Sequence, residues 1–149
     1  MKRGLSIAII ILALIGVGIS GYLYSLHGSD FSDKVCEINA TFSCGAVDQS
    51  SYSELYGIPV SLLGIIGYGL LALGALVKIF DKTGDRGITL FILLASVGGL
   101  GFALYLTAVE AFVLHAWCLY CVVQQIDILI IFVLALVLFF KERHDIIKT

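Results

Sequence analysis

Residues 117–140 read WCLYCVVQQIDILIIFVLALVLFF, a run that is apolar along almost its whole length. It exceeds the roughly 20 residues that a helix needs to cross a hydrocarbon layer about 30 Å thick. Cys118 and Cys121 stand at its start, spaced as Cys-x-x-Cys. The run therefore predicts a membrane-spanning helix with two thiols at its entrance.

Three further apolar stretches predict that the rest of the chain also spans the membrane. Of the 149 residues, 60% are hydrophobic and 13% are charged, whereas about a quarter of the residues of a soluble domain are charged. The four expected spans cover about 5–26, 58–80, 88–113 and 117–140, with an outer loop at about 27–57. The first stretch is longer than the h-region of a cleaved signal peptide, the alternative for it, which has about 7–15 residues. We expect residues 1–149 to form a single all-α membrane domain, a four-transmembrane-helix bundle.

The basic residues predict how this bundle lies in the membrane, because Lys and Arg favour the cytoplasmic side. They precede the first expected span, lie at or between the second and third, and follow the fourth: Lys2, Arg3, Lys78, Lys82, Arg86, Lys141, Arg143 and Lys148. Only Lys34 falls on the other side. We therefore expect a multi-pass plasma-membrane protein with both termini cytoplasmic. All four cysteines then lie on the extracytoplasmic face, where disulfides persist.

The spacing of Cys118 and Cys121 predicts reactive thiols. Residues at i and i+3 lie on one face of a helix, so the two thiols can form or exchange a disulfide. In the first turn of a helix, backbone N–H groups lack partners and the helix dipole is positive. Both features favour the thiolate, which is the species that attacks disulfides.

The outer loop contains a local helix signal. Ser51-Tyr52-Ser53-Glu54 matches a capping box, with Ser51 as the N-cap and Glu54 at the third helical position. Gly57 can end such a helix in a left-handed conformation. Pro59 suits the first turn of the next span, where its missing N–H has no cost. We therefore expect a short amphipathic helix that lies over the mouth of the bundle as a lid.

Cys36 and Cys44 in the outer loop complete a set of four cysteines, for which three interpretations compete. A zinc site is disfavoured, because these two cysteines lie eight residues apart and structural zinc sites typically space them by about two to four. Inert disulfides would make the chain a structural four-span membrane protein. We favour a relay in which two pairs exchange electrons, because a Cys-x-x-Cys at a helix start is of the catalytic type. The sequence has no basic patch with interleaved aromatic residues, so we do not expect nucleic acid as a partner.

Together these features resemble the vitamin K epoxide reductase family, in particular its bacterial and archaeal disulfide-forming members. The resemblance covers nearly the whole chain. It rests on the loop pair Cys36 and Cys44, on residues 57–64 (GIPVSLLG) and on residues 117–121 (WCLYC), in the setting of four spans. It implies a four-helix bundle around a quinone site, with electrons passing from protein thiols to ubiquinone, menaquinone or vitamin K.

The resemblance also implies roles for single residues. Cys121 matches the thiol beside the quinone ring, and Cys118 matches its resolving partner, which faces the loop. Cys44 matches the loop cysteine that exchanges with the helix pair, and Cys36 the one that meets an external protein. Ser61 matches a small polar residue near the site.

Two positions depart from the pattern of the vertebrate vitamin K enzymes, which have Asn where this chain has Val60 and Tyr where it has Gln125. Both positions are thought to hold the quinone oxygens in those enzymes. The departures therefore favour a disulfide-forming oxidase over epoxide reduction. Gln125 nevertheless lies on one helical stripe with Cys118 and Cys121. It is expected to donate to a quinone carbonyl oxygen or, alternatively, to bond a neighbouring helix.

Three other polar residues are candidates near the thiols or at membrane depth, where ionisable groups are rare and costly. Asp127 lies off the thiol stripe and is interpreted as a hydrogen-bonding residue of the bundle interior, with a proton relay as the alternative. Glu110 is expected to orient His115 or the loop, or to be solvated. His115 is either a thiolate-stabilising cation or an interfacial residue without a redox role.

We therefore expect a membrane thiol-disulfide oxidoreductase. Electrons would pass from a reduced extracytoplasmic thioredoxin-fold protein through Cys36/Cys44 and Cys118/Cys121 to a quinone. Because the chain ends shortly after the fourth span, this partner is expected to be a separate protein. The alternatives are reduction of vitamin K quinone or epoxide by the same cysteines, and a structural membrane protein with disulfide staples.

Overall fold

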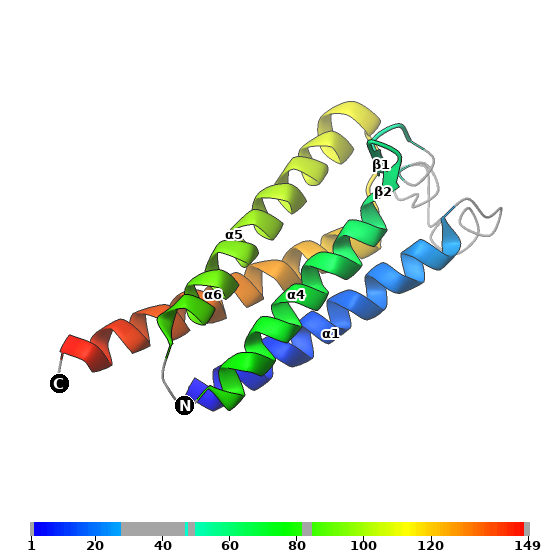
Figure 1. Ribbon diagram of the computed structural model, residues 1–149. Coiled ribbons are helices and arrows are strands. Elements are labelled where there is room, and N and C mark those ends of the chain that lie inside the picture. Colours follow the sequence, from blue (N-terminus) through cyan, green and yellow to red (C-terminus); the bar gives the residue numbers. More distant parts are fainter. Residues whose placement is uncertain (1, 28–46, 48–49, 82–84, 148–149) are drawn as a thin grey trace.

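The computed structural model describes residues 2–27, 47, 50–81 and 85–147, which include four long helices (Figure 1). These are α1 (Lys2–Leu26), α4 (Val60–Phe80), α5 (Arg86–Val109) and α6 (Leu119–Ile147). A π-helix, η1 (Glu110–Leu114), continues α5, and the strands β1 (Glu54–Leu55) and β2 (Ile58–Pro59) precede α4. The start of α1 and the end of α6 lie at one end of the bundle, and the β1–β2 hairpin lies at the other (Figure 1).

The four long helices form a closed ring. Helix α1 packs on α4 and α6, and α5 packs on the same two helices. Small residues allow α1 and α4 to approach closely, as is typical of helix pairs in membranes. A Cβ atom on Gly64 would lie 2.5 Å from the Ser20 hydroxyl oxygen. The core of the ring is apolar and includes Ile9, Leu71 and Ile131.

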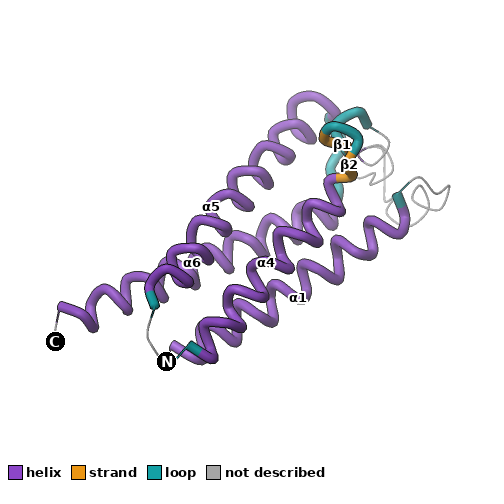
Figure 2. Tube along the Cα trace, viewed as in Figure 1, coloured by secondary structure: helices purple, strands orange, loops and turns teal. Residues whose placement is uncertain are grey.

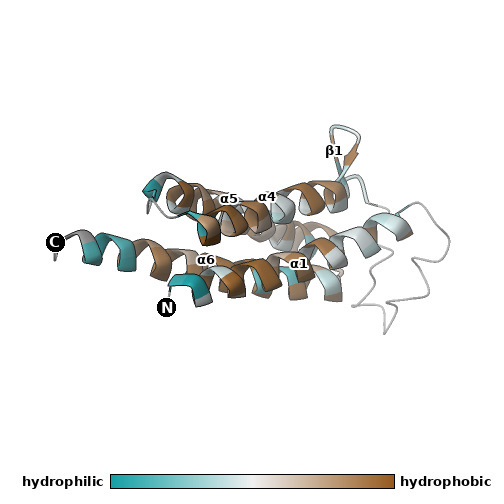
Figure 3. Ribbon diagram, turned by 60° about the horizontal axis from the view of Figure 1, so that its bottom comes forward, coloured by the Kyte–Doolittle hydropathy of each residue, from teal (hydrophilic) through white to brown (hydrophobic). Residues whose placement is uncertain are grey.

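The outward faces of the helices are also apolar. Leu14, Leu73 and Leu94, on three different helices, are 57%, 59% and 61% exposed, and Figure 3 shows hydrophobic residues along all four helices. Soluble monomers rarely expose apolar surface of this extent. Within the described residues, four helices are long and apolar enough to cross a membrane. The predicted fold class, an all-α four-helix membrane bundle, is confirmed.

The predicted lid helix at Ser51–Gly57 is wrong. Figure 2 shows loop and two short strands there, and β1 pairs antiparallel with β2, with Leu55 opposite Ile58. Tyr56 and Gly57, between the strands, both have positive φ angles (54° and 80°), as the type I′ turn of a two-residue hairpin requires. Because Tyr56 is left-handed, a helix that began at the expected capping box would contain too few residues to offset the free-energy cost of starting a helix.

The hairpin is tied directly to the helices beside it. The Val60 backbone N–H donates to the Ser53 carbonyl oxygen at 2.8 Å. Pro59 is the residue before α4 rather than a member of its first turn. His27 Nε2, at the end of α1, lies 3.2 Å from Glu54 Oε1. These contacts hold the segment from Ser53 to Pro59 across the mouth of the bundle.

The connection from α5 to α6 positions the Cys-x-x-Cys pair. The wider turn of η1 covers Glu110–Leu114 and ends at His115, whose φ of 50° is left-handed. A residue in this conformation is a common way to end a helix. After it, the chain turns back so that Cys118 lies immediately before α6, as the sequence predicts.

Candidate functional site

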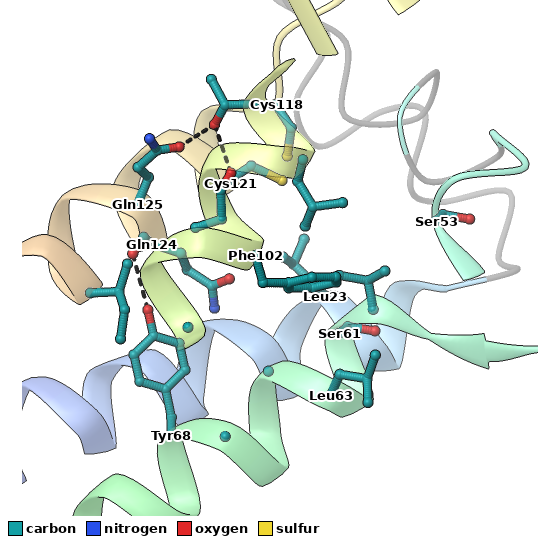
Figure 4. A pocket seen from close by; sticks show the side chains of 18 of the residues that line it. Leu23, Ser53, Ser61, Leu63, Tyr68, Phe102, Cys118, Cys121, Gln124 and Gln125 are labelled. Carbon is teal, nitrogen blue, oxygen red and sulfur yellow. Dashed lines mark hydrogen bonds between the residues drawn. The ribbon is translucent and has the colours of Figure 1, made fainter. Parts of the chain in front are cut away.

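A cavity of about 420 Å³ lies inside the helix ring, toward the hairpin end. Its walls come from all four long helices and from the segment before β1. The lining is mainly apolar, with a few polar side chains, which is the usual composition of a small-molecule site. Both Cys118 and Cys121 are part of this lining, and Figure 4 shows their sulfur atoms side by side, facing the cavity.

The start of α6 positions the two cysteines. The Cys118 carbonyl oxygen accepts from the Val122 N–H at 3.1 Å, which makes Cys118 the N-cap residue and places Cys121 in the first turn. Cys118 is only 3% exposed, whereas Cys121 is partly buried. Cys121 carries a free thiol group.

The electrostatics of this pair favour a thiolate at Cys118. A hydrogen bond from the Cys121 thiol lowers the pKa of the Cys118 thiol, although burial acts in the opposite direction. Cys121 can therefore serve as the hydrogen-bond donor and Cys118 as the sulfur that carries the charge. This is the arrangement that a thiol–disulfide exchange requires, because the thiolate is the attacking species.

Glu110 contacts both cysteines. Its Oε2 atom accepts from the Cys118 backbone N–H at 3.3 Å, and its carboxyl group is within hydrogen-bonding reach of the Cys121 thiol. Glu110 is 3% exposed and lines the cavity. The expectation that Glu110 is solvated is therefore wrong, and the alternative that it orients His115 or the loop stays a prediction. His115 itself is exposed and does not line the cavity.

Gln125 lies in the cavity lining together with the cysteines, as the helical stripe predicts. Its Oε1 atom accepts a hydrogen bond from the Thr107 hydroxyl of α5. This contact matches the alternative in which the amide bonds a neighbouring helix. It also leaves the Nε2 group as the atom of Gln125 that can donate to a bound molecule. The two interpretations are thus compatible in this structure.

Val60 and Ser61 reach the cavity from the first turn of α4. Val60 offers only alkyl atoms there, since its backbone N–H is used by Ser53. Ser61 offers a hydroxyl group across the cavity from the cysteine pair (Figure 4). The structure thus brings together Cys118, Cys121, Gln125, Val60 and Ser61, and their roles toward a quinone stay predictions.

Cys36 and Cys44 lie outside the described residues, so their predicted exchange with the helix pair stays a prediction. The described part of the outer loop nevertheless reaches the pair, because Val47 packs against Cys118. Val47 follows Cys44 by three residues.

Two cavity residues of α6 and α4 were missed in the sequence. The Gln124 Nε2 atom donates to the Ser20 hydroxyl at 2.6 Å and to the Gly16 carbonyl oxygen at 3.2 Å. The Tyr68 hydroxyl donates to the Gln124 carbonyl oxygen at 3.0 Å. Gln124 lies at i+3 from Cys121, so the same helical periodicity that selected Gln125 also points to it.

Asp127 stands apart from the cavity. It is 6% exposed on α6 and is not part of the lining. Its carboxyl group interacts with the Tyr68 hydroxyl, which faces it from α4. Asp127 thus lies in the bundle interior, as interpreted, but its Oδ2 atom has no hydrogen-bond partner among the described residues, so its hydrogen-bonding role stays a prediction.

Comparison with known protein families matches residues 7–136 to the vitamin K epoxide reductase family. The chain belongs to this family. The predicted resemblance is therefore confirmed, and the chain is a multi-pass membrane protein of an oxidoreductase family whose members generally use quinone or vitamin K. A comparison with curated proteins gave no match. As a member of the vitamin K epoxide reductase family, the chain carries its Cys-x-x-Cys pair on the wall of a mainly apolar cavity.

Proposed function

We propose that this protein is a quinone-dependent thiol-disulfide oxidoreductase that makes disulfides in an extracytoplasmic partner. The observation that carries the proposal is that Cys118 and Cys121 meet at one wall of the cavity inside the helix ring. A disulfide between them would be formed at the place where a lipid-soluble electron acceptor can bind.

The lining fits a quinone. A cavity of about 420 Å³ is within the range of small-molecule sites, roughly 300–1,000 Å³. Its apolar walls suit a hydrophobic ring, and the hydroxyl of Ser61 and the amide of Gln125 suit ring oxygens. When bound, a quinone supplies an acceptor for two electrons and two protons.

The residues of this chain supply the thiol chemistry. A reduced thioredoxin-fold protein attacks Cys36 of a Cys36–Cys44 disulfide, and Cys44 leaves as a thiolate. The partner's second thiol then displaces Cys36, so the partner is oxidised and the loop pair is reduced. Cys44 next attacks Cys118 of a Cys118–Cys121 disulfide and releases Cys121 as a thiolate beside the cavity.

The second half of the cycle restores both disulfides. Cys36 displaces Cys118 from Cys44, which re-forms the loop disulfide and leaves Cys118 and Cys121 reduced. The disulfide of the helix pair forms again when the pair gives up two electrons and two protons. The packing of Val47 on Cys118 supports this route, because it tethers the loop segment after Cys44 to the helix pair. The chain from Cys44 to Val47, about three residues, can span at most roughly 11 Å.

The sidedness of the bundle belongs to the same proposal. The described basic residues at the start of α1, around the α4–α5 connection and at the end of α6 lie at the end of the bundle away from the cysteine pair. By the positive-inside rule we therefore expect both termini to be cytoplasmic. The cysteines then face the extracytoplasmic side of the plasma membrane, where a secreted thioredoxin-fold protein can reach them. Reduction of an epoxide is disfavoured, because Val60 presents no hydrogen-bonding side chain to the cavity.

The test uses the full chain in lipid nanodiscs, with a reduced thioredoxin-fold protein as donor and a short-chain ubiquinone or menaquinone analogue as acceptor. Quinol and partner disulfide should form in equal amounts. Cys118→Ala and Cys121→Ala should each lower the rate by at least about 10³-fold, as removal of a covalent catalyst does. Tyr120→Phe is the matched control, because Tyr120 lies between the cysteines but does not line the cavity. Unchanged quinone reduction in either cysteine variant would refute the proposal.

A further inference from the structure

Glu110 is a buried carboxyl group that the thiol–disulfide steps above do not use. It is 3% exposed, it lies at the junction of α5 and η1, and it faces the cavity. A carboxyl group inside the span of a membrane protein is costly, so its presence there indicates a role. Single π-turns of this kind often occur at functional sites.

The contacts of Glu110 point to the cysteine pair. Oε2 accepts from the Cys118 backbone N–H at 3.3 Å, which holds the carboxyl group at the start of α6. From this position the carboxyl group reaches the thiol of Cys121, one turn further along the helix. Glu110 is thus within hydrogen-bonding reach of a sulfur atom that must lose its proton during the reaction.

The charges around Glu110 favour proton transfer over a fixed ion pair. The described residues that line the cavity include no Lys, Arg or His. The other titratable groups among them are Cys118 and Cys121 at α6, Tyr68 on α4 and Tyr52 before β1. Two adjacent anions without a cation are strongly disfavoured in such a site. When Cys118 is bonded to another sulfur, or replaced, and so carries no charge, Glu110 and Cys121 are therefore expected to hold one negative charge and one proton between them.

We propose that Glu110 is the proton acceptor of the Cys121 thiol. The S–H bond of Cys121 breaks and an O–H bond forms on Glu110, so a thiol and a carboxylate become a thiolate and a carboxylic acid without a change in total charge. The reverse transfer returns the proton when Cys121 leaves a disulfide as a thiolate. This inference rests on the proposed function, since it supplies the proton acceptor for the same thiol pair.

The alternative is that Glu110 only holds the start of α6. Glutamine separates the two roles, because its Oε1 atom still accepts from the backbone N–H at position 118 but its amide cannot take up a proton. The effect of Glu110→Gln on protonation can therefore be measured with the helix junction retained. Glu110→Asp, by contrast, keeps a carboxyl group at the site that can take up a proton.

The experiment measures the rate at which iodoacetamide alkylates Cys121 in the full chain with Cys118→Ala. The pH runs from about 4 to about 10, which brackets ordinary carboxyl and thiol pKa values. A pair that shares one proton should give two titration steps with a plateau between them. When Glu110→Gln is added, the plateau should vanish and one titration step should remain. At pH values below that step, the alkylation rate should fall about tenfold per pH unit.

The matched control is Asp127→Asn, which removes a buried carboxyl group of α6 outside the cavity and should keep the two-step profile. A single step in the chain that retains Glu110 would overturn the inference, whether or not the Glu110 variants fold. So would a plateau that survives Glu110→Gln. Because alkylation needs neither quinone nor partner, loss of quinone turnover with an intact two-step profile would instead contradict the proposed function.

Discussion

The ring of Tyr68 on α4 occupies the space beside the backbone of Gly16 on α1. A Cβ atom on Gly16 would lie 2.5 Å from ring carbon atoms of Tyr68. The same tyrosine donates to the Gln124 carbonyl oxygen of α6. One side chain thus joins three helices at the base of the cavity, and it does so only because residue 16 has no side chain.

Gly16→Ala should therefore destabilise the bundle. The methyl group forces the Tyr68 ring to move, and overpacking of this kind typically costs about 1–3 kcal/mol. Gly18→Ala is the control, because a Cβ atom there has nothing within 4 Å. Unfolding in detergent, followed by circular dichroism, should show a clear loss for the first variant only. Equal stability of the two variants would show that the close contact between Gly16 and Tyr68 does not affect the stability of the bundle.

Gln125→Leu should weaken quinone binding without unfolding the protein. The substitution removes the Nε2 donor and keeps a side chain of similar size. Loss of one such hydrogen bond costs about 0.5–1.5 kcal/mol, so we expect KM for the quinone to rise about tenfold at most and kcat to change less. Steady-state quinone reduction in nanodiscs measures both constants. Unchanged turnover would leave Gln125 with its structural contact to Thr107 alone.

Gln124→Leu offers a contrast on the adjacent residue. Its amide is already used by Ser20 and Gly16 of α1, so its loss should lower thermal stability and alter KM less than Gln125→Leu. A pattern in which the two variants exchange these effects would contradict the assignment of the two amides.

The Cys118 thiol should react with small alkylating reagents at lower pH than an ordinary cysteine. Its pKa is lowered by the hydrogen bond from Cys121, so the thiolate persists as the pH falls below the usual thiol pKa of about 8.5. Cys121→Ala removes that donor and should shift the alkylation profile of Cys118 toward higher pH. Labelling rates followed by mass spectrometry test this. An unshifted profile would mean that Cys121 does not stabilise the thiolate.

Much of this fold was predictable, because a membrane imposes simple rules. Runs of about 20 apolar residues must be helices, and the Cys-x-x-Cys pair had to lie near the start of the last one. The face of that helix followed from its periodicity, which predicts that Gln125 lies on the same side as the cysteines, and Gln125 does line the cavity with them. Family membership rested on short motifs in the expected order, and residues 7–136 match the family.

Other features depended on contacts that a local pattern does not record. Gly57 suits the end of a helix and a type I′ turn equally well, and the pairing of Leu55 with Ile58 favours the turn. The contact of Glu110 with the Cys118 backbone N–H depends on the reversal of the chain between η1 and α6, where His115 is left-handed. No helical period relates residues on either side of such a reversal, so the sequence pattern could not predict this contact.

The central claim is that Cys121 lies against a quinone in the cavity, and visible absorbance tests it most directly. In nanodiscs with a bound quinone, Cys118→Ala prevents the helix disulfide and leaves the Cys121 thiolate beside the ring, which should produce a charge-transfer band. Cys121→Ala, with Cys118 intact, should show no such band. A band of equal strength in both variants, or in neither, would contradict the account.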